Sequence, residues 1–152
     1  AGAPQCPASS SGGALCLIAG MLHYPSFGLG CASGVQREHV ASAMQLGYRF
    51  FDTAQAYQWG YREHEVGEAW SQSRIPRDQV FLQTKIEPAN YGKAKTKISF
   101  ARSCQNLQTT YVDSVLLHYP TEGWQEAWHE LEELHGEGKA RHIGVSNFNA
   151  EQ

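Results

Sequence analysis

Hydrophobic and polar residues follow two alternating periods along the chain from residue 26 onward. Apolar residues recur at helical spacing in the segments 36–47, 62–73, 92–108 and 123–139. Short apolar runs typical of strands occupy 26–30, 48–52, 80–85, 112–118 and 140–146. Because strands that alternate with helices form parallel βαβ units, this order predicts an α/β fold built on a parallel sheet.

The segment 123–139 is the clearest predicted helix, because its apolar residues form one continuous stripe. The stripe consists of Trp124, Ala127, Trp128, Leu131 and Leu134. The run 112–118 is apolar at nearly every position, which is typical of a strand covered on both faces. We expect the aromatic residues on the helical stripes to pack in the core.

Four of the five predicted strands end on a residue that packing alone does not require. These residues are Asp52, Lys85, His118 and Ser146, separated by about the length of one βαβ unit. Parallel strands present their C-terminal ends at one side of the sheet, so we expect the four side chains to converge. One charged residue at a strand end is commonly just solvated, whereas four in register indicate a site.

The residues at these strand ends suit proton transfer, together with Tyr57 in the loop after Asp52. A free phenol has a pKa of about 10, but a nearby ammonium stabilises the phenolate and lowers that pKa. Lys85 can supply the ammonium, and Asp52 can hold it in place. His118 can orient a carbonyl oxygen or share in the proton transfer. This arrangement fits the reduction of an aldehyde or ketone by hydride from a cofactor.

Four segments resemble the successive signatures of the aldo-keto reductases, in the order and at the intervals of that family. They are GYRFFDTAQAY, VFLQTKI, YVDSVLLHYP and IGVSNF. The resemblance runs from about Ser26 to the C-terminus. It implies a TIM (β/α)₈ barrel that reduces small-molecule carbonyl compounds with NADPH.

Carried over residue by residue, the resemblance also implies the site residues. The catalytic tetrad falls on Asp52, Tyr57, Lys85 and His118. Within it, Tyr57 is the general acid and His118 faces the substrate. The nicotinamide carboxamide would be held by Ser146 and Asn147, and Asp52 also borders the cofactor.

Two segments depart from the family pattern. The loop QWGYREHEVG after Tyr57 is about three residues longer than the common form, and its Trp59 and Tyr61 either line a substrate pocket or cap the barrel rim. Residues 1–25 form an atypical head in place of the usual N-terminal hairpin. We expect its start to be disordered and its apolar run ALCLIAG to be a short strand or covering segment.

Residues 26–152 correspond to the N-terminal portion of a barrel. A complete barrel of this class needs about 250 residues, and the 152 residues supply about four and a half βα units. In relatives, the second half holds the aromatic residue that stacks on the nicotinamide and the loop that grips the 2′-phosphate. We expect a fragment of a longer protein, with association through the open barrel edge as the alternative. A non-catalytic binding or regulatory half-barrel is the second function class.

A Rossmann-type dehydrogenase is a remote alternative. The segment GLGCASG is glycine-rich and Asp52 follows it, but the third glycine of the G-x-G-x-x-G pattern comes one residue late, at Gly34. Tyr91 and Lys95 form the Y-x-x-x-K pattern of short-chain dehydrogenases, but in a predicted loop. No two histidines stand at ligand spacing on one predicted face, so we expect no metal site.

Charge and cysteine content narrow the possible partners and location. The net charge of −3 provides no basic face for nucleic acid or an anionic membrane. The four cysteines form no C-x-x-C pair, which favours reduced thiols and a cytoplasmic location. No apolar run approaches the roughly 20 residues of a membrane span. We therefore expect neither a nucleic-acid partner nor a membrane partner.

Overall fold

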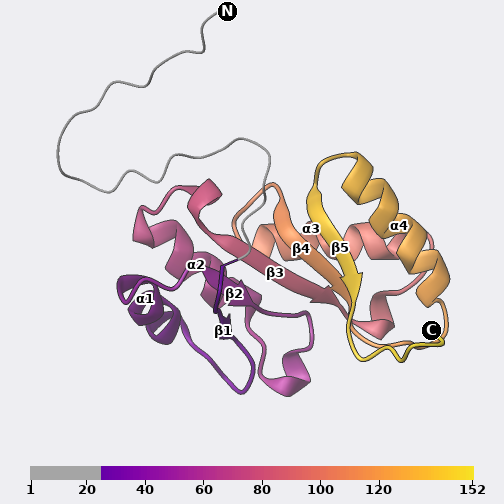
Figure 1. Cartoon of the computed structure of the whole chain (residues 1–152), viewed down its shortest axis with the longest axis horizontal. Helices are drawn as coiled ribbons and strands as arrows, with labels where there is room; N and C mark the ends of the chain where they lie inside the picture. The colour runs from indigo at the N-terminus through magenta and orange to yellow at the C-terminus, as the bar shows by residue number, and fades with distance from the viewer. Residues whose placement is uncertain (1–24) are drawn as a thin grey trace, which may run out of the picture.

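Five strands and four helices alternate along residues 25–152, the part of the chain that this computed structural model describes (Figure 1). The strands are β1 (Leu29–Gly30), β2 (Phe50–Asp52), β3 (Phe81–Ile86), β4 (Val112–Leu117) and β5 (Ala140–Val145). The helices are α1 (Arg37–Gln45), α2 (Glu63–Ser73), α3 (Lys95–Asn106) and α4 (Trp124–Gly136). Three 3₁₀ helices lie in loops: η1 (Tyr57–Trp59), η2 (Arg77–Gln79) and η3 (Pro88–Asn90). The predictions for the head, with Cys6 and Cys16, lie outside the described residues.

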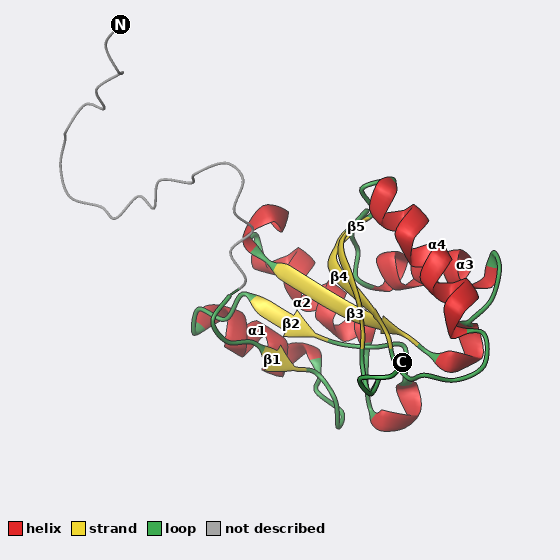
Figure 2. Cartoon of the chain, turned by 45° about the vertical axis from the view of Figure 1, so that its right-hand side comes forward, coloured by secondary structure: helices red, strands yellow, loops and turns green. Residues whose placement is uncertain are grey.

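The strands form one parallel sheet in the order β1-β2-β3-β4-β5. Every connection leads from one strand to the next strand of the sheet, and crossovers between parallel strands are right-handed. The four helices therefore lie on the same side of the sheet (Figure 2). This order is that of successive barrel strands, whereas a Rossmann sheet grows from its first strand in two directions. The predicted α/β class and barrel arrangement are confirmed. The Rossmann alternative is wrong.

The hydrophobic core fills the space between the sheet and the helices. The helices contribute Val40, Met44, Val66, Phe100 and Leu131, which are almost completely buried. The predicted stripe of α4 is confirmed, although Trp124 and Trp128 pack against the core from a partly buried position.

Strand β3 presents two chemically different faces, because side chains alternate along a strand. Leu82 and Ile86 are fully buried in the core. Gln83 and Lys85 point to the opposite face, where Gln83 lies in register with Asp52 of β2 and Ser114 of β4. The face of the sheet away from the core therefore carries a row of polar side chains.

A buried carboxylate ties the N-terminal ends of β3, β4 and β5 together. Asp113 is 2% exposed, and its Oδ2 accepts hydrogen bonds from Arg77 Nη2 at 2.7 Å and from the backbone N–H of Leu82 at 2.9 Å. Its Oδ1 accepts a hydrogen bond from Arg141 Nη1 at 3.0 Å. In barrels of this class the N-terminal ends serve stability and the C-terminal ends serve chemistry, so we interpret Asp113 as structural.

Helices α2 and α3 approach each other closely at Gly67. A Cβ atom at this position would lie 2.1 Å from the backbone oxygen of Asn106. No side chain fits in that space, so the contact between the two helices requires glycine.

Candidate active site

Asp52 and Lys85 form an ion pair at the C-terminal ends of β2 and β3. Lys85 Nζ donates hydrogen bonds to Asp52 Oδ1 at 2.6 Å and to the backbone oxygen of Thr53 at 3.2 Å. Gln83 Nε2 donates to the same Asp52 oxygen at 2.8 Å. The Lys85 side chain is 8% exposed and that of Asp52 is 30% exposed. The ammonium is therefore fixed between two acceptors and largely removed from water.

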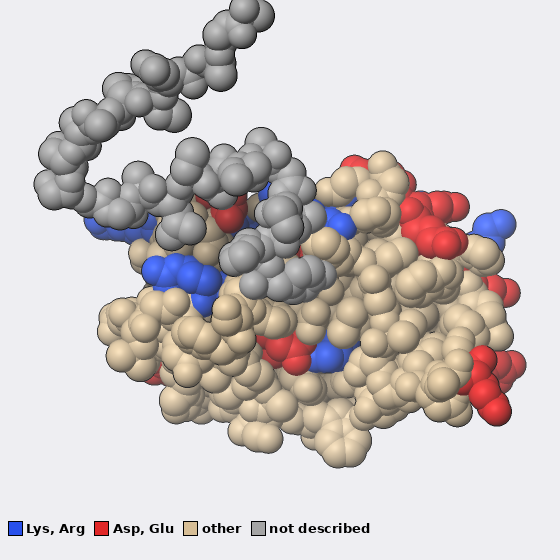
Figure 3. Space-filling view, viewed as in Figure 1, with Lys and Arg blue, Asp and Glu red and all other residues tan. Residues whose placement is uncertain are grey.

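Figure 3 shows this face of the molecule in space-filling form. Acidic and basic side chains adjoin at the centre of the view, and the surface immediately around them is mostly uncharged. Because the Lys85 side chain is largely buried, this ion pair is screened less by water and salt than a fully exposed pair.

His118 follows β4 and lies next to this ion pair. Its side chain is 7% exposed, and Nδ1 lies 3.5 Å from Glu87 Oε2. Neither of these two buried atoms has a hydrogen-bond partner in the described part of the chain. Burial and the Lys85 ammonium lower the pKa of His118, and the Glu87 carboxylate opposes that change. At neutral pH the imidazole is therefore neutral.

Ser146 and Asn147 follow β5 and stand beside His118. The Ser146 N–H donates to the backbone oxygen of Leu117 at 2.8 Å. Asn147 Nδ2 donates to the backbone oxygen of His118 at 2.8 Å and to Ser146 Oγ at 3.0 Å. Asn147 adopts a φ of 61°, a conformation that asparagine tolerates better than most residues. The strand ends thus bring Asp52, Lys85, His118, Ser146 and Asn147 to one side of the sheet.

Tyr57 is not brought to these residues. Its hydroxyl accepts a hydrogen bond from Asn106 Nδ2 of α3 at 3.2 Å, and 47% of its surface is exposed. Within residues 25–152 it makes no contact of this kind with Lys85 or His118. The expectation that the Tyr57 hydroxyl lies beside Lys85 is therefore not met, because the loop turns this side chain toward the helical layer.

Tyr61 of the same loop lies beside Lys85 and His118. Lys85 Nζ lies 5.3 Å from the centroid of the Tyr61 ring, and the rings of Tyr61 and His118 meet edge to face with centroids 6.1 Å apart. Trp59, the other aromatic residue of this loop, is 60% exposed. Burial raises the pKa of both Tyr57 and Tyr61, and a carboxylate adds to the rise in each case.

Gln83 and Glu87 belong to the site but were not predicted from the sequence. Gln83 supports the carboxylate of Asp52, and Glu87 faces His118. Both stand two residues from Lys85, so the period of two along a strand places all three on one face. A polar residue at every second position from 83 to 87 was the signal that could have identified them.

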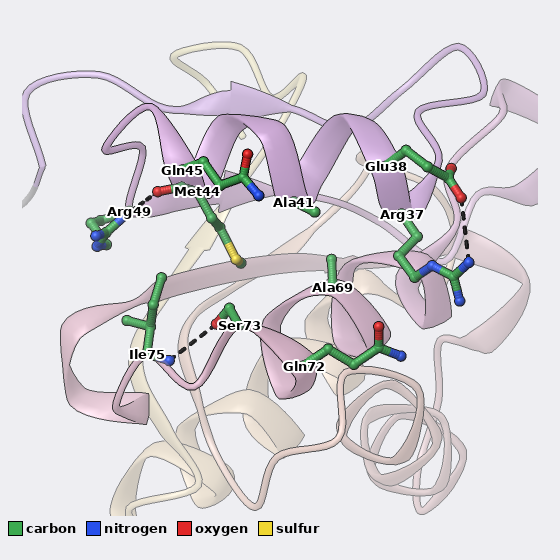
Figure 4. A pocket seen from close by; sticks show the side chains of 10 residues that line it. All are labelled: Arg37, Glu38, Ala41, Met44, Gln45, Arg49, Ala69, Gln72, Ser73 and Ile75. Carbon is green, nitrogen blue, oxygen red and sulfur yellow. Dashed lines mark hydrogen bonds and ion pairs between the residues drawn. The ribbon is translucent and has the colours of Figure 1, made fainter.

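The other cysteines, acidic groups and hollows of the described residues do not form a second candidate active site. Cys31 and Cys104 are buried free thiols, and burial raises the pKa of Cys31 to about 12. Residues 25–152 contain no group of three or more histidine, cysteine and acidic residues arranged to bind a metal, and none of their helices could span a membrane. A hollow of about 650 Å³ lies between α1 and α2, with Met44 and Ala69 among its lining residues (Figure 4). It contains none of the residues at the strand ends.

Comparison with known proteins identifies the family. A sequence profile described as "Aldo/keto reductase family" matches residues 28–152. Morphine 6-dehydrogenase of Pseudomonas putida is 37% identical over 134 residues, which are 84% of this chain and 44% of that protein. Methylglyoxal reductase DkgB of Yersinia pestis is 41% identical over 131 residues, which are 82% of this chain and 48% of that protein.

A solved structure agrees with these relatives. The aldo/keto reductase of Klebsiella pneumoniae, in complex with NADP and acetate, has a TM-score of 0.70 and 35% sequence identity, covering 84% of this chain and 47% of that one. The chain spans about half the length of the curated relatives it matches. From residue 28 onward, the chain belongs to the aldo/keto reductase family.

Proposed function

We propose that this chain carries the proton-transfer half of an NADPH-dependent reductase that converts an aldehyde or ketone to an alcohol. The observation that carries the proposal is the Lys85–Asp52 ion pair, whose ammonium is largely buried, next to His118 at the C-terminal ends of adjacent strands. Membership of a family with named carbonyl reductases supports it.

Each group has a distinct task in this proposal. The Lys85 ammonium stabilises a phenolate and so makes a neighbouring tyrosine a stronger acid. Asp52 keeps the ammonium in position through a 2.6 Å hydrogen bond. Neutral His118 directs a ring N–H at the carbonyl oxygen of the substrate. By the sequence motif, Tyr57 is the proton donor. Trp59, in the loop after it, would line the substrate pocket.

The residues after β5 fit the nicotinamide end of NADPH. Asn147 uses its NH₂ group on His118 and Ser146, which leaves its Oδ1 as an acceptor. The Ser146 hydroxyl accepts from Asn147 and keeps its own hydrogen to donate. A carboxamide has one acceptor and one donor group, so these two side chains complement it. NADPH supplies the hydride when it is bound.

The substrate class follows from the relatives and from the site. A methylglyoxal reductase is among the similar proteins, and we propose that this chain acts on small reactive aldehydes of the same kind. At the strand ends, His118 offers a ring N–H to the oxygen of such a carbonyl group. Because the chain spans about half of its relatives, the specificity and activity of the whole protein belong to the same proposal.

The test measures oxidation of NADPH by methylglyoxal with two proteins. One is the purified chain, and the other is the chain extended by the remaining strands of the Yersinia relative. We expect aldehyde-dependent loss of nicotinamide absorbance that Lys85→Met abolishes. Lys97→Met, which removes a surface lysine paired with Glu133 on α4, is the matched control and should keep the rate.

The outcomes separate the two function classes. Turnover in either protein that depends on Lys85 supports the reductase. If NADPH binds to both but no aldehyde is reduced, the chain is a binding module and the reductase proposal is wrong. If turnover occurs and Lys85→Met leaves it unchanged, the assignment of the site is wrong.

A further inference from the structure

Tyr61 lies against the ammonium and the imidazole of the site, although the sequence motif points to Tyr57. The ring of Tyr61 covers Lys85 Nζ at 5.3 Å and meets His118 at a centroid distance of 6.1 Å. Tyr57 instead reaches Asn106 on α3, and its ring lies under the guanidinium of Arg62 at 5.8 Å. The two tyrosines of this loop therefore face different layers of the fold.

Hydrogen-bond capacity also distinguishes them. A lysine ammonium has three N–H donors, and Lys85 uses one on Asp52 and one on Thr53. Its third donor and the hydroxyl of Tyr61 have no hydrogen-bond partner among residues 25–152. The Tyr57 hydroxyl accepts a bond from Asn106, which holds it at α3, away from the third donor of Lys85. Burial raises the pKa of both phenols. A cation next to a phenol favours the phenolate, and Lys85 Nζ lies against the ring of Tyr61.

The backbone of the loop fixes which tyrosine faces the strand ends. Gly60 has a φ of 81°, and a Cβ atom there would lie 2.5 Å from the backbone nitrogen of Gly34. That nitrogen donates to the backbone oxygen of Gly60 at 3.1 Å, which holds the loop after β1 against this segment. Arg62 Nη1 then donates to the backbone oxygens of Tyr57 and Tyr61 and closes the turn. Tyr61 leaves this turn on the side of β2 and β3.

We propose that Tyr61, and not Tyr57, is the general acid of the reduction, an assignment that rests on the proposed function. The O–H bond of Tyr61 breaks and its proton goes to the carbonyl oxygen, while the carbonyl carbon takes up the hydride of the reduced nicotinamide. The phenolate left on Tyr61 accepts the third N–H of Lys85 and regains its proton from solvent. The longer loop after β2 thus carries the catalytic hydroxyl four positions beyond the motif tyrosine.

Kinetics of paired variants test the assignment in the active protein identified above. We expect Tyr61→Phe to lower kcat by about 100-fold or more, with a much smaller change in KM, because general acids contribute about that much. Tyr57→Phe should have an effect at least tenfold smaller. Tyr48→Phe, which loses a hydroxyl on a ring packed against Phe27, is the matched control and should leave kcat unchanged.

A second measurement requires no turnover. In the chain labelled with ¹³Cζ-tyrosine, we expect Lys85→Met to raise the pKa of Tyr61, because the variant removes the adjacent cation. Lys97→Met should leave that titration in place. A nuclear Overhauser contact between the Tyr61 ring and the Lys85 ε-methylene, with no such contact from Tyr57, tests the geometry in the unmodified chain.

The results distinguish failure of this assignment from failure of the proposed function. If aldehydes are reduced and Tyr57→Phe is the more damaging variant, Tyr61 is not the acid and the function stands. If Lys85→Met leaves the pKa of Tyr61 unchanged and the Overhauser contact is absent, the geometry behind the assignment is wrong. If no aldehyde is reduced by any form, the general-acid role fails together with the function, even where Lys85 and Tyr61 are coupled.

Discussion

Replacing Asp113 tests whether the carboxylate at the N-terminal strand ends stabilises the sheet. Asp113→Ala leaves the N–H of Leu82 without its acceptor and the Arg77 guanidinium, 14% exposed, without its carboxylate partner, although Arg77 keeps its hydrogen bonds to other oxygen acceptors nearby. Removing one partner of a buried ion pair costs about 3–5 kcal/mol. Because Arg141 is 39% exposed, its own bond to Asp113 contributes only about 0–1 kcal/mol. We therefore expect Asp113→Ala to lower the free energy of unfolding by about 4 kcal/mol.

Two further variants divide this loss into its parts. Asp113→Asn keeps one oxygen for Arg77 and Leu82 but removes the charge and turns an NH₂ group toward Arg141, so we expect a loss of about 2 kcal/mol. Arg141→Gln should cost less than about 1 kcal/mol. Urea unfolding followed by tryptophan fluorescence gives all three values. The reasoning would be refuted if Asp113→Ala lost less than 1 kcal/mol, or if Arg141→Gln were as damaging as Asp113→Ala.

Three other predictions concern single residues. The Glu87 carboxylate raises the pKa of His118, whereas burial and the Lys85 ammonium lower it. Glu87→Gln should therefore lower that pKa further, as measured by ¹H NMR; a rise would contradict the contact between Glu87 and His118. Gly67→Ala should cost at least about 1–3 kcal/mol in urea unfolding because its Cβ meets a backbone oxygen at 2.1 Å, and a neutral result would mean that the two helices separate easily. With a thiol pKa of about 12, Cys31 should be alkylated slowly at pH 8 until the chain unfolds, as peptide mapping can show; rapid alkylation in the folded chain would contradict its burial.

The fold and the residues on strand ends were predictable because periodicity determines both. Asp52, Lys85 and His118 each terminate an apolar run, and parallel pairing places such residues together wherever the run is recognised. The sequential strand order agrees with the general tendency of consecutive strands to be neighbours in a sheet. These inferences need no knowledge of side-chain direction in loops.

The direction of Tyr57 could not be predicted by counting residues. The side chain of a loop residue is set by contacts far away in sequence, here the approach of Gly34 to Gly60 and the bond from Asn106. A motif records the distance from the strand in residues, and Tyr57 keeps that distance from Asp52. The extra residues follow Tyr57, and the turn that they form decides which tyrosine faces the strand ends. The loop length was visible in the sequence, but the turn that it forms was not.

The polar positions of β3 also make the pairing of this strand unusually well defined during folding. A shift of one residue against β2 or β4 would exchange the two faces of the strand. Gln83 and Lys85 would then enter the core, and Leu82 and Ile86 would face the uncovered side of the sheet. Burying an unpaired ammonium costs several kcal/mol, so misaligned pairings are strongly disfavoured. The same lysine that the site uses for chemistry thereby selects the correct alignment of the sheet.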